Sequence, residues 1–581
     1  MTRHRLRLTA RRLLVAALAV FAVGASAPAA GAFTVLSQPD SSPAVPIAES
    51  NLPPPGRRLS PDQVLAIAAR VPEIHRLATQ YPGCYAGAYL KGSDRWQVST
   101  FTRDGTKEIG QVLIADHTGR VLEAWTGFQV AWTMARGYPG AFGHSVDAVY
   151  IWIPLLLLFC FPFVDWRHPR RLLHLDLLAL CSFSVSLAFF NHANIGLSVP
   201  LVYPPLIYLL VRMLMIAGPG RRRTGSVPTA RLHLNVSRTW FVVAIVFLVG
   251  FRIGLNVENS NVIDVGYAGV IGAHRIVHGE SLYGHWPASN PHGDTYGPVS
   301  YEAYVPFVAV FGWSGRWDDL PAAHAAAIVF DLLAIGLCFL LGRRVRGPTL
   351  GLALAFAWAA NPFTLFALDS NTNDTLVAVL VLVALLVATG KRVRPEARGV
   401  TAALAGLTKF APLALAPLLA THGLAGPLRR RALLVARFAI AFAVCFAVVS
   451  LPALTHNSLR TVWEDTLVYQ ANRGSPFSVW GLYGGLGPVQ AVVEVAAVVL
   501  ALALAVLPRA PGTVGLAAAG AAILLGLQLG VDHWFYLYIP WFLPLVMLAL
   551  LGGYREGGAR LGAVGARAAD GWPGGVKAVA G

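Results

Sequence analysis

Eleven apolar runs constrain this chain more than any other feature of its sequence. A helix needs about 20 mostly apolar residues to cross the hydrocarbon core of a bilayer, and these runs approach or reach that length. The chain of 581 residues is 55% hydrophobic and 13% charged, which excludes an ordinary soluble protein. We therefore expect an all-α polytopic membrane protein with about 11 spans. The runs are 147–164, 172–190, 197–217, 240–256, 321–342, 348–367, 374–390, 432–454, 488–507, 513–530 and 534–552.

The net charge of +17 is concentrated in short basic clusters between these runs. Cytoplasmic loops carry an excess of Lys and Arg, so the clusters predict the cytoplasmic side of each pair of spans. This placement favours a multi-pass cell-membrane protein in a lipid bilayer and argues against a nucleic-acid partner, which would need a continuous basic face. The clusters lie at 167–171, 221–223, 343–346, 391–398 and 429–431.

The N-terminal region predicts an export signal followed by a small domain. Arginines precede the apolar run Leu13–Val23, and small residues follow it, so 1–32 is interpreted as a signal peptide or an uncleaved signal anchor. Residues 33–59 form a Pro/Ser-rich linker. Within the exported region the sequence has one cysteine, Cys84, so we expect no disulfide framework there.

Residues 60–127 predict a small exported α+β domain. Ser60–Gln63 is a capping box with proline at the first helical position, and Pro72 begins a second short helix that ends near Gln80. Four alternating runs with turn residues between the later three predict an antiparallel meander. Together with the stretch Asp116–Leu122, this order resembles a PepSY-type domain, which would be a regulatory or packing module. The four runs are 85–91, 95–102, 109–115 and 120–126.

The remaining boundaries follow from the runs and their charges. We expect a linker at 128–146, three accessory spans with a basic cytoplasmic loop at 147–239, a membrane core at 240–552 and a cytoplasmic tail at 553–581. If the N-terminal module is exported and each apolar run crosses the membrane once, two runs would place the basic clusters that follow them outside the cell, against the positive-inside rule. The run 299–313 is therefore predicted to lie in the interface rather than to cross. The run 399–428 is predicted to be two half-helices that meet near Lys409, a broken helical hairpin of the kind that lines sites.

With this topology, acids and cations converge on the extracytoplasmic face. They come from the polar loop 257–298, the joint 368–374, the hairpin tip and the loop 455–487. Such a set suits a phosphate-bearing substrate beside a proton acceptor. The candidate residues are Glu258, Asp264, Asp294, Tyr296, Asn371, Asn373, Asp374, Lys409 and Arg473.

An Asp-bearing first outer loop, an interfacial element and an outer Lys/Arg pair resemble the GT-C glycosyltransferases. Within them, the chain looks most like glycosyltransferase family 87, the actinobacterial mannosyltransferase-like proteins. The sharpest local stretches are Asp264–Ala268, Gly293–Pro298, Asn371–Asp374, Thr408–Phe410 and Arg473–Ser478.

The resemblance implies an inverting enzyme that transfers a sugar from a polyprenyl-phosphate donor to a glycolipid or envelope glycan acceptor. It implies that no cofactor is needed and leaves the need for a divalent metal open. On this sequence it implies that Asp264, with Asp294 as the second candidate, is the general base. It implies that Lys409 and Arg473 bind the donor phosphate. The remaining candidates would contact substrate.

Simpler roles exist for the same residues. Asp264 could cap a helix, Asp294 could fix a turn, Lys409 could reach the interface and Arg473 could be a solvated loop residue. His274 and His278 are four residues apart and could bind a metal, although the sequence carries no His-Glu-x-x-His motif. We therefore assign no metal ligands from the sequence.

Two other functions compete with glycosyl transfer. A transporter or flippase for a lipid-linked substrate would share the broken hairpin and would use charges at mid-bilayer depth, for which Arg252 and Asp331 are candidates. A non-catalytic scaffold would use the exported module to recruit an enzyme of envelope assembly.

Overall fold

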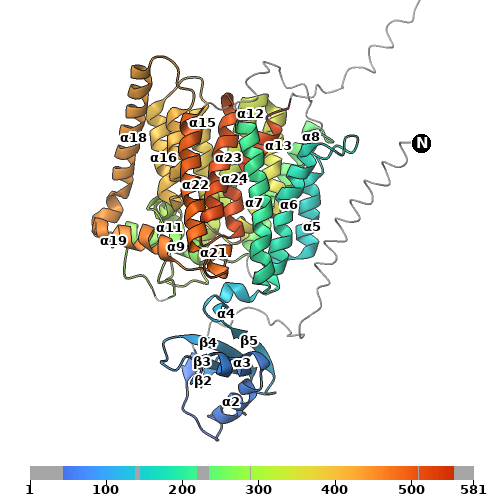
Figure 1. Ribbon diagram of the computed structural model, residues 1–581, viewed down its shortest axis with the longest axis vertical. Helices are drawn as coiled ribbons and strands as arrows, with labels where there is room; N and C mark the ends of the chain where they lie inside the picture. Colours follow the sequence, from blue (N-terminus) through green and yellow to red (C-terminus); the bar gives the residue numbers. More distant parts are fainter. Residues whose placement is uncertain (1–43, 138–143, 219–233, 288, 508–509, 555–581) are drawn as a thin grey trace, which may run out of the picture.

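The computed structural model describes residues 44–137, 144–218, 234–287, 289–507 and 510–554. Figure 1 shows a bundle of long helices with a small sheet domain below one end. The predicted signal segment 1–32, the cluster 221–223 and nearly all of the tail lie outside the described residues. The all-helical membrane fold with an N-terminal α+β domain is confirmed, while its orientation across a membrane stays a prediction.

The N-terminal domain is a five-stranded antiparallel sheet with strand order β1-β2-β3-β4-β5. The four predicted strands and the two predicted helices are all present. Strand β1 was not expected, because its three residues lie in the stretch interpreted as a linker and carry too little pattern. It pairs with β2. The elements are β1 (Ala44–Pro46), α2 (Pro61–Ala69), α3 (Pro72–Gln80), β2 (Tyr85–Lys91), β3 (Arg95–Phe101), β4 (Glu108–Ala115) and β5 (Val121–Thr126).

Local sequence signals account for this domain. Ser60 caps α2 by accepting a hydrogen bond from Gln63 N, and the Gln63 side chain accepts one from Ser60 N at 3.0 Å. Trp96 on β3 is fully buried and donates from Nε1 to Asp116 Oδ1 at 2.8 Å. Asp116 also accepts from the backbone N–H groups of Arg58 and Leu59. These contacts give Asp116 a structural role, and the resemblance to a PepSY-type domain stays a prediction.

The bundle follows the apolar runs closely. Its elements up to the middle of the chain are α4 (Phe128–Ala131), η1 (Thr133–Arg136), η2 (His144–Asp147), α5 (Val149–Cys160), α6 (Leu172–Asn191), α7 (Ile195–Ala217), α8 (Arg238–Glu258), α9 (Asp264–His278), α10 (Val299–Glu302), α11 (Val305–Phe311), α12 (Pro321–Arg346), α13 (Pro348–Ala360) and α14 (Pro362–Asp369).

The second part of the bundle has more short elements, several of them at the end of the bundle near the sheet domain. They are α15 (Asp374–Ala388), α16 (Pro395–Lys409), η4 (Ala411–Leu415), α17 (Ala416–Thr421), α18 (Leu428–Leu454), α19 (Leu459–Trp463), η5 (Glu464–Val468), α20 (Tyr469–Asn472), α21 (Val479–Leu482), α22 (Gly487–Val506), α23 (Gly512–Gly530), η6 (Tyr536–Tyr538) and α24 (Ile539–Leu551).

Each of the eleven predicted runs contains a helix or a bent helix pair, but not all are long enough to cross alone. Among the described residues, seven helices have the length and composition of a span, and α13 with α14 forms an eighth that bends by 56°. The other three runs contain α5, α15 and α24, which have 12, 15 and 13 residues. A helix of 15 residues is about 22 Å long, shorter than the hydrocarbon core. Eight of the eleven runs thus have the length of a span, and crossing by the other three stays a prediction.

Burial differs sharply between the centre and the edge of the bundle. Every residue of α24 is buried, whereas α18 is almost wholly exposed on the side away from α16. Figure 1 shows α18 standing at one edge of the bundle, next to α16. An exposed apolar helix of 27 residues is typical of a surface that faces lipid.

The predicted broken hairpin is confirmed. Helix α16 ends at Lys409, and Phe410 adopts a positive φ of 57°, a conformation that non-glycine residues rarely take. The chain then turns back through η4 and α17. Arg398, near the start of α16, donates to His422 O at 2.7 Å and to Ala388 O at 2.7 Å. The two feet of the hairpin therefore lie together, and its tip lies inside the bundle.

The segment 299–313 does not cross the bundle, as predicted. The ends of the helices that flank this region lie together, because His324 Nδ1 in α12 is 3.3 Å from Asn256 Oδ1 in α8. The segment forms two short helices, α10 and α11, rather than one element. Both pack closely on α9: a Cβ at Gly272 would lie 2.3 Å from Tyr301 Cδ1, so glycine permits this approach.

Candidate functional site

An ion pair marks the centre of the candidate site. The Lys409 ammonium, at the hairpin tip, lies 2.7 Å from Asp374 Oδ1, in the first turn of α15. Trp541 Nε1 in α24 donates to the same oxygen at 2.9 Å. Both charged side chains are at least nine-tenths buried. Two of the predicted site residues thus meet, although they are 35 positions apart in the sequence.

Aromatic rings surround the Lys409 ammonium. It lies 5.3 Å from the ring centroid of Tyr296, 5.7 Å from that of Tyr538 and 5.9 Å from that of Trp541. Ring faces attract a cation and also exclude water from it. An ammonium group has three N–H donors, and the hydrogen bond from Lys409 to Asp374 uses one of them.

The loop that carries Tyr296 is docked on the hairpin tip. Gly297 N donates to Thr408 O at 2.8 Å, and Ser300 Oγ donates to the same oxygen at 3.1 Å. A Cβ at Gly297 would lie 2.0 Å from Leu407 O, so no other residue fits without moving the backbone. This close approach explains why the Gly293–Pro298 stretch places Tyr296 on Lys409.

Asp264 is the first residue of α9 and remains accessible to solvent. The surrounding protein raises the pKa of its carboxyl above the usual value, while the positive charges of Arg473 and Lys409 oppose that rise. Ile263, not Asp264, occupies the capping position, and its side chain makes no cap. The simple capping role is therefore not what the structure shows.

The start of α9 is fixed by its neighbours. Asn290 Nδ2 donates to Asp264 O at 2.9 Å, and Ile263 N donates to Ser370 O at 3.2 Å. A Cβ at Gly266 would lie 2.1 Å from Asn371 O, so the helix and the 368–374 joint are in direct contact. The position of Asp264 is thus set by backbone contacts on two sides.

Arg473 lies in the loop after α20 and is half-buried. Its guanidinium group is 5.5 Å from the centroid of the Trp132 ring. The adjoining loop is held by Ser475, whose N–H donates to Asp532 Oδ2 at 3.1 Å and whose hydroxyl lies 2.9 Å from His533 Nδ1. Burial and the charges of Arg473 and Lys409 hold the pKa of His533 well below its usual value. Arg473 therefore stands beside a neutral histidine.

The structure brings five of the nine predicted residues into one group. Asp264 interacts electrostatically with Arg473, Lys409 and Asp374, and the same charges act on Tyr296. One carboxylate that is open to solvent thus faces two cations, one of which is paired. This group can hold an anion near a proton acceptor.

Two further candidates support the site from outside it. Asn371 has a positive φ of 47°; its side chain donates to Asn261 O at 2.8 Å and accepts from Asn256 Nδ2 at 2.9 Å. These bonds tie the joint to the end of α8. Asn373 precedes α15 and is buried, and within the described chain its side-chain amide has no hydrogen-bond partner. A contact of either residue with substrate stays a prediction.

Asp294 and Glu258 are not brought to Lys409 by any contact of the described residues. Asp294 is buried and accepts from Gly284 N at 2.9 Å, which ties two parts of the 257–298 loop together. Burial raises the pKa of its carboxyl. Glu258 ends α8 and is exposed. Their parts in catalysis and binding stay predictions.

Four aromatic or histidine residues of the site escaped the sequence analysis. Tyr538 and Trp541 belong to a stretch that was interpreted as an ordinary span, yet its density of rings was a usable signal. His533 precedes that stretch. Trp132 lies in a segment interpreted as a linker, and nothing in the sequence around it indicated a contact with Arg473.

The rings of the two histidines considered as metal ligands lie next to each other, with centroids 4.0 Å apart and planes tilted by 37°. His278 Nδ1 lies 2.8 Å from His274 O, so a backbone bond occupies it. In the described part of the chain, no group of three or more His, Cys, Asp or Glu side chains is placed to hold a metal ion.

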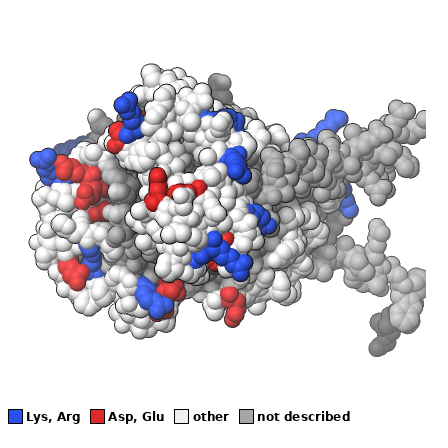
Figure 2. Space-filling model, turned by 90° about the horizontal axis from the view of Figure 1, so that it is seen from below, with Lys and Arg blue, Asp and Glu red and all other residues white. Residues whose placement is uncertain are grey.

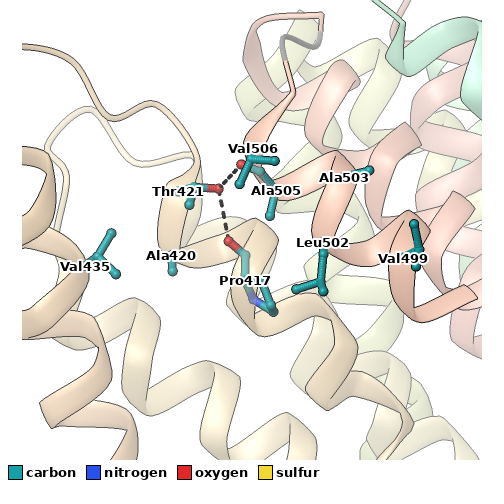
Figure 3. Close-up of a pocket in the computed structure, with 9 residues that line it drawn as sticks. All are labelled: Pro417, Ala420, Thr421, Val435, Val499, Leu502, Ala503, Ala505 and Val506. Carbon is teal, nitrogen blue, oxygen red and sulfur yellow. Dashed lines mark hydrogen bonds between the residues drawn. The ribbon is translucent and has the colours of Figure 1, made fainter. Parts of the chain in front are cut away.

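An apolar cavity of about 470 Å³ lies between the returning arm of the hairpin and two neighbouring helices. Figure 3 shows α17 in the middle, with Val435 of α18 on one side and Leu502 of α22 on the other. The Thr421 hydroxyl donates to Ala505 O at 2.7 Å and to Pro417 O at 3.0 Å, so it offers little polarity to the cavity. The cavity can hold an apolar chain.

The surface around the sheet domain carries both signs of charge. Figure 2 shows Lys and Arg side chains interspersed with Asp and Glu side chains on the face seen from below. A mixed surface provides weak steering for a polyanion.

The family comparison gives a match over the second half of the membrane region. Residues 295–531 match the model of glycosyltransferase family 87. Over these residues, the chain is similar to that family. The match agrees with the resemblance drawn from the sequence. It includes Tyr296, Asp374, Lys409 and Arg473, and it leaves out Asp264 and the sheet domain.

Among solved structures, the chain is similar to a crystal structure of ArnT from Cupriavidus metallidurans bound to undecaprenyl phosphate, with 18% identity and a TM-score of 0.36. The similarity covers 55% of this chain and 60% of that one, so this chain spans less than two thirds of that protein. No curated protein matches the chain.

Proposed function

We propose that the protein is an integral membrane glycosyltransferase that transfers a sugar from a polyprenyl-phosphate donor to a lipid or envelope glycan acceptor. Mannose is the specific sugar that we propose, and the extracytoplasmic face is the proposed side. The observation that carries the proposal is the solvent-accessible Asp264 beside Arg473 and the Lys409–Asp374 pair. The family 87 segment supplies three of these four residues.

In the proposed reaction, Asp264 accepts the proton of the acceptor hydroxyl. The hydroxyl oxygen then attacks the anomeric carbon and forms the new glycosidic bond. The bond between that carbon and the phosphate oxygen breaks, and the electron pair leaves with the polyprenyl phosphate. Attack from the face opposite the leaving group inverts the anomeric centre. The raised pKa of Asp264 makes it a stronger base than an ordinary aspartate.

Arg473 and Lys409 would stabilise the departing phosphate. Arg473 offers a planar fork of donors, which matches two phosphate oxygens. Lys409 is paired with Asp374, whose carboxylate also accepts from Trp541, and three aromatic rings surround the ammonium group. Fixed charges that need no rearrangement during the reaction are the most effective kind.

The apolar cavity supports a donor with an isoprenoid chain. The hairpin arm that lines it through Pro417 and Thr421 begins at the tip that carries Lys409. A phosphate at the tip and an apolar tail along this arm would place each part of the donor in a matching environment. Lipid-exposed charges are costly, so a phosphate is expected at the tip rather than along the arm.

The test is transfer of radiolabelled mannose from polyprenyl-phosphate mannose in membranes that contain the protein. We expect a glycosidic product with wild type and none above background with Asp264→Ala. Asp318→Ala is the matched control, because Asp318 is an exposed acid that pairs with Arg316. The proposal fails if wild-type membranes form no product, or if Asp264→Ala forms as much as the control.

The proposed orientation has its own test. Ser314 lies in the exposed loop between α11 and α12. A cysteine introduced by Ser314→Cys should react with an impermeant thiol reagent added outside intact cells. Reaction only after permeabilisation would place this loop, and with it the candidate site, in the cytoplasm.

The two charged residues considered for a transporter, Arg252 and Asp331, do not favour that function. Arg252 Nη2 lies 2.6 Å from Asp331 Oδ1, and Arg252 Nε lies 2.8 Å from Asp331 Oδ2. Trp358 Nε1 also donates to Asp331 Oδ1, at 2.7 Å. The two charges are thus bound to each other inside the bundle rather than offered to a substrate.

A further inference from the structure

A short segment, α4 to η1, joins the sheet domain to the helical bundle and makes contacts with both. On the sheet side, Arg136 Nη2 donates to Gln111 Oε1 in β4 at 2.6 Å. The same guanidinium group lies 5.8 Å from the centroid of the Trp125 ring in β5. The segment is therefore attached to the sheet by a side chain that engages two strands.

On the bundle side, Trp132 reaches the candidate site. Its ring meets Phe477 edge-on with centroids 5.4 Å apart, and its centroid is 6.0 Å from that of His533. The segment is anchored nearby, because Gln129 Nε2 donates to Ala193 O at 3.4 Å. A Cβ at Gly137 would lie 2.5 Å from Ala193 N, so the backbone also packs tightly against the turn between α6 and α7.

The position of Trp132 affects the side chain of Arg473. The central carbon of its guanidinium group lies 5.5 Å from the centroid of the Trp132 ring. A guanidinium held against an aromatic face has fewer orientations and can still donate from the N–H groups at its edge. An arginine in a loop otherwise has many rotamers, and fixing them costs free energy when a ligand binds. A ring that fixes the guanidinium in advance reduces that cost.

We propose that Trp132 is a positioning residue for Arg473, and that the sheet domain completes the phosphate-binding site through the α4–η1 segment. Trp132 lies outside the family 87 match, so the segment adds a part that the matched residues lack. The inference rests on the proposed function, because it assumes that Arg473 binds the donor phosphate. It assigns the sheet domain a role in donor binding rather than in recruitment alone.

The experiment measures binding of undecaprenyl monophosphate to the full-length protein in lipid nanodiscs. Trp132→Ala is expected to raise the Kd by about 2- to 30-fold, the range of one cation–π contact. Trp132→Phe keeps a ring face and is expected to recover most of the affinity. Phe128→Ala is the matched control, because Phe128 is an exposed aromatic residue of the same segment. It is expected to bind like wild type.

A double-mutant cycle separates positioning from packing. If Trp132 acts through Arg473, adding Trp132→Ala to Arg473→Ala should weaken binding no further than Arg473→Ala alone. Additive losses would show a contribution independent of Arg473 and would overturn the proposal. The melting temperature of each variant in nanodiscs is measured alongside, and a Trp132→Phe variant that is folded but binds as poorly as Trp132→Ala would also overturn it.

The two proposals can fail separately. Wild-type protein that binds the lipid phosphate and transfers sugar, with Trp132→Ala unchanged in affinity, would overturn the inference and leave the proposed function standing. Wild-type protein that neither binds undecaprenyl monophosphate nor transfers sugar would overturn both.

Discussion

Two buried ion pairs in the bundle have the same pattern of partners around the aspartate but different surroundings around the cation. In each, an aspartate accepts from a tryptophan indole and from a cation: Asp331 with Trp358 and Arg252, and Asp374 with Trp541 and Lys409. Arg252 further donates to Ala359 O and Thr364 Oγ1. Lys409 instead faces aromatic rings and stands near the solvent-accessible Asp264.

The difference teaches which buried charge is available for chemistry. The Arg252–Asp331 pair is closed, because protein groups satisfy both partners inside the bundle, as buried charges require. The Lys409–Asp374 pair is open, because among the described residues one of the three N–H donors of the lysine is used in a hydrogen bond. Burial and pairing alone would not have distinguished them; the count of satisfied donors does.

The largest expected effect is on turnover at the open site. Asp264→Asn keeps the shape of the side chain but removes the proton acceptor. Sugar transfer should fall by roughly 10²–10⁴-fold, the usual contribution of a positioned base. Transfer rates in membranes and binding of undecaprenyl monophosphate measure the two parts separately. Near-normal transfer by Asp264→Asn would move the base to Asp294 or Glu258.

The closed pair should respond in stability rather than in chemistry. Asp331→Asn leaves the Arg252 charge buried without its partner, and breaking a buried pair in this way typically costs about 3–5 kcal/mol. The free energy of unfolding in a denaturing-detergent titration should fall accordingly, while the folded fraction keeps its transfer rate per molecule. A folded Asp331→Asn variant that has lost transfer would show that the closed pair also serves the reaction.

A smaller effect is expected at the open pair itself. Lys409→Met combined with Asp374→Asn removes both charges and leaves no buried carboxylate unpaired. Loss of one charge-assisted hydrogen bond to phosphate, about 1.5–3 kcal/mol, should lower kcat/KM for the donor by roughly 10- to 150-fold. Steady-state rates at several donor concentrations give the value. An unchanged kcat/KM would mean that Arg473 alone binds the phosphate.

The smallest expected effect is a displaced acid limb in the pH profile. A base acts only when deprotonated, so activity is lost as the pH falls through its pKa. Desolvation by the surrounding protein raises the pKa of Asp264 above the ordinary 3.8, which should place the acid limb of kcat/KM above that pH. Residual activity in Asp264→Asn should lack this limb, and Asp294→Asn should keep it. A limb lost with Asp294→Asn would assign the titration to Asp294.

The sequence predicted the path of the chain best where the length of an apolar run and the placement of the basic clusters disagreed. Basic clusters at both ends of the run 399–428 could not be reconciled with one crossing, and the hairpin anchored by Arg398 is the result. The same reasoning kept 299–313 from crossing. Charge placement is a long-range constraint that a single sequence reveals, because it depends on the membrane rather than on the packing partners.

The pairing of side chains could not be predicted in the same way. Lys409 and Asp374 were both expected at the site, as separate substrate contacts, yet they bind each other. Trp132 and Arg473 are more than 300 positions apart, and only the folded chain brings them together. Strand β1 escaped for a local reason, since three residues carry almost no periodicity.

The anchored hairpin fixes how far the Lys409 ammonium group lies from the end of the bundle. Arg398 fixes the foot of α16 by its bonds to Ala388 O and His422 O, and Lys409 ends the same helix. Eleven residues of α-helix separate them, a length of about 16 Å. The helix thus works as a ruler between the bundle end and the ammonium group. The number of residues in α16 therefore determines the level at which a donor phosphate could be held. Deleting one turn of this helix would move that level by about 5 Å.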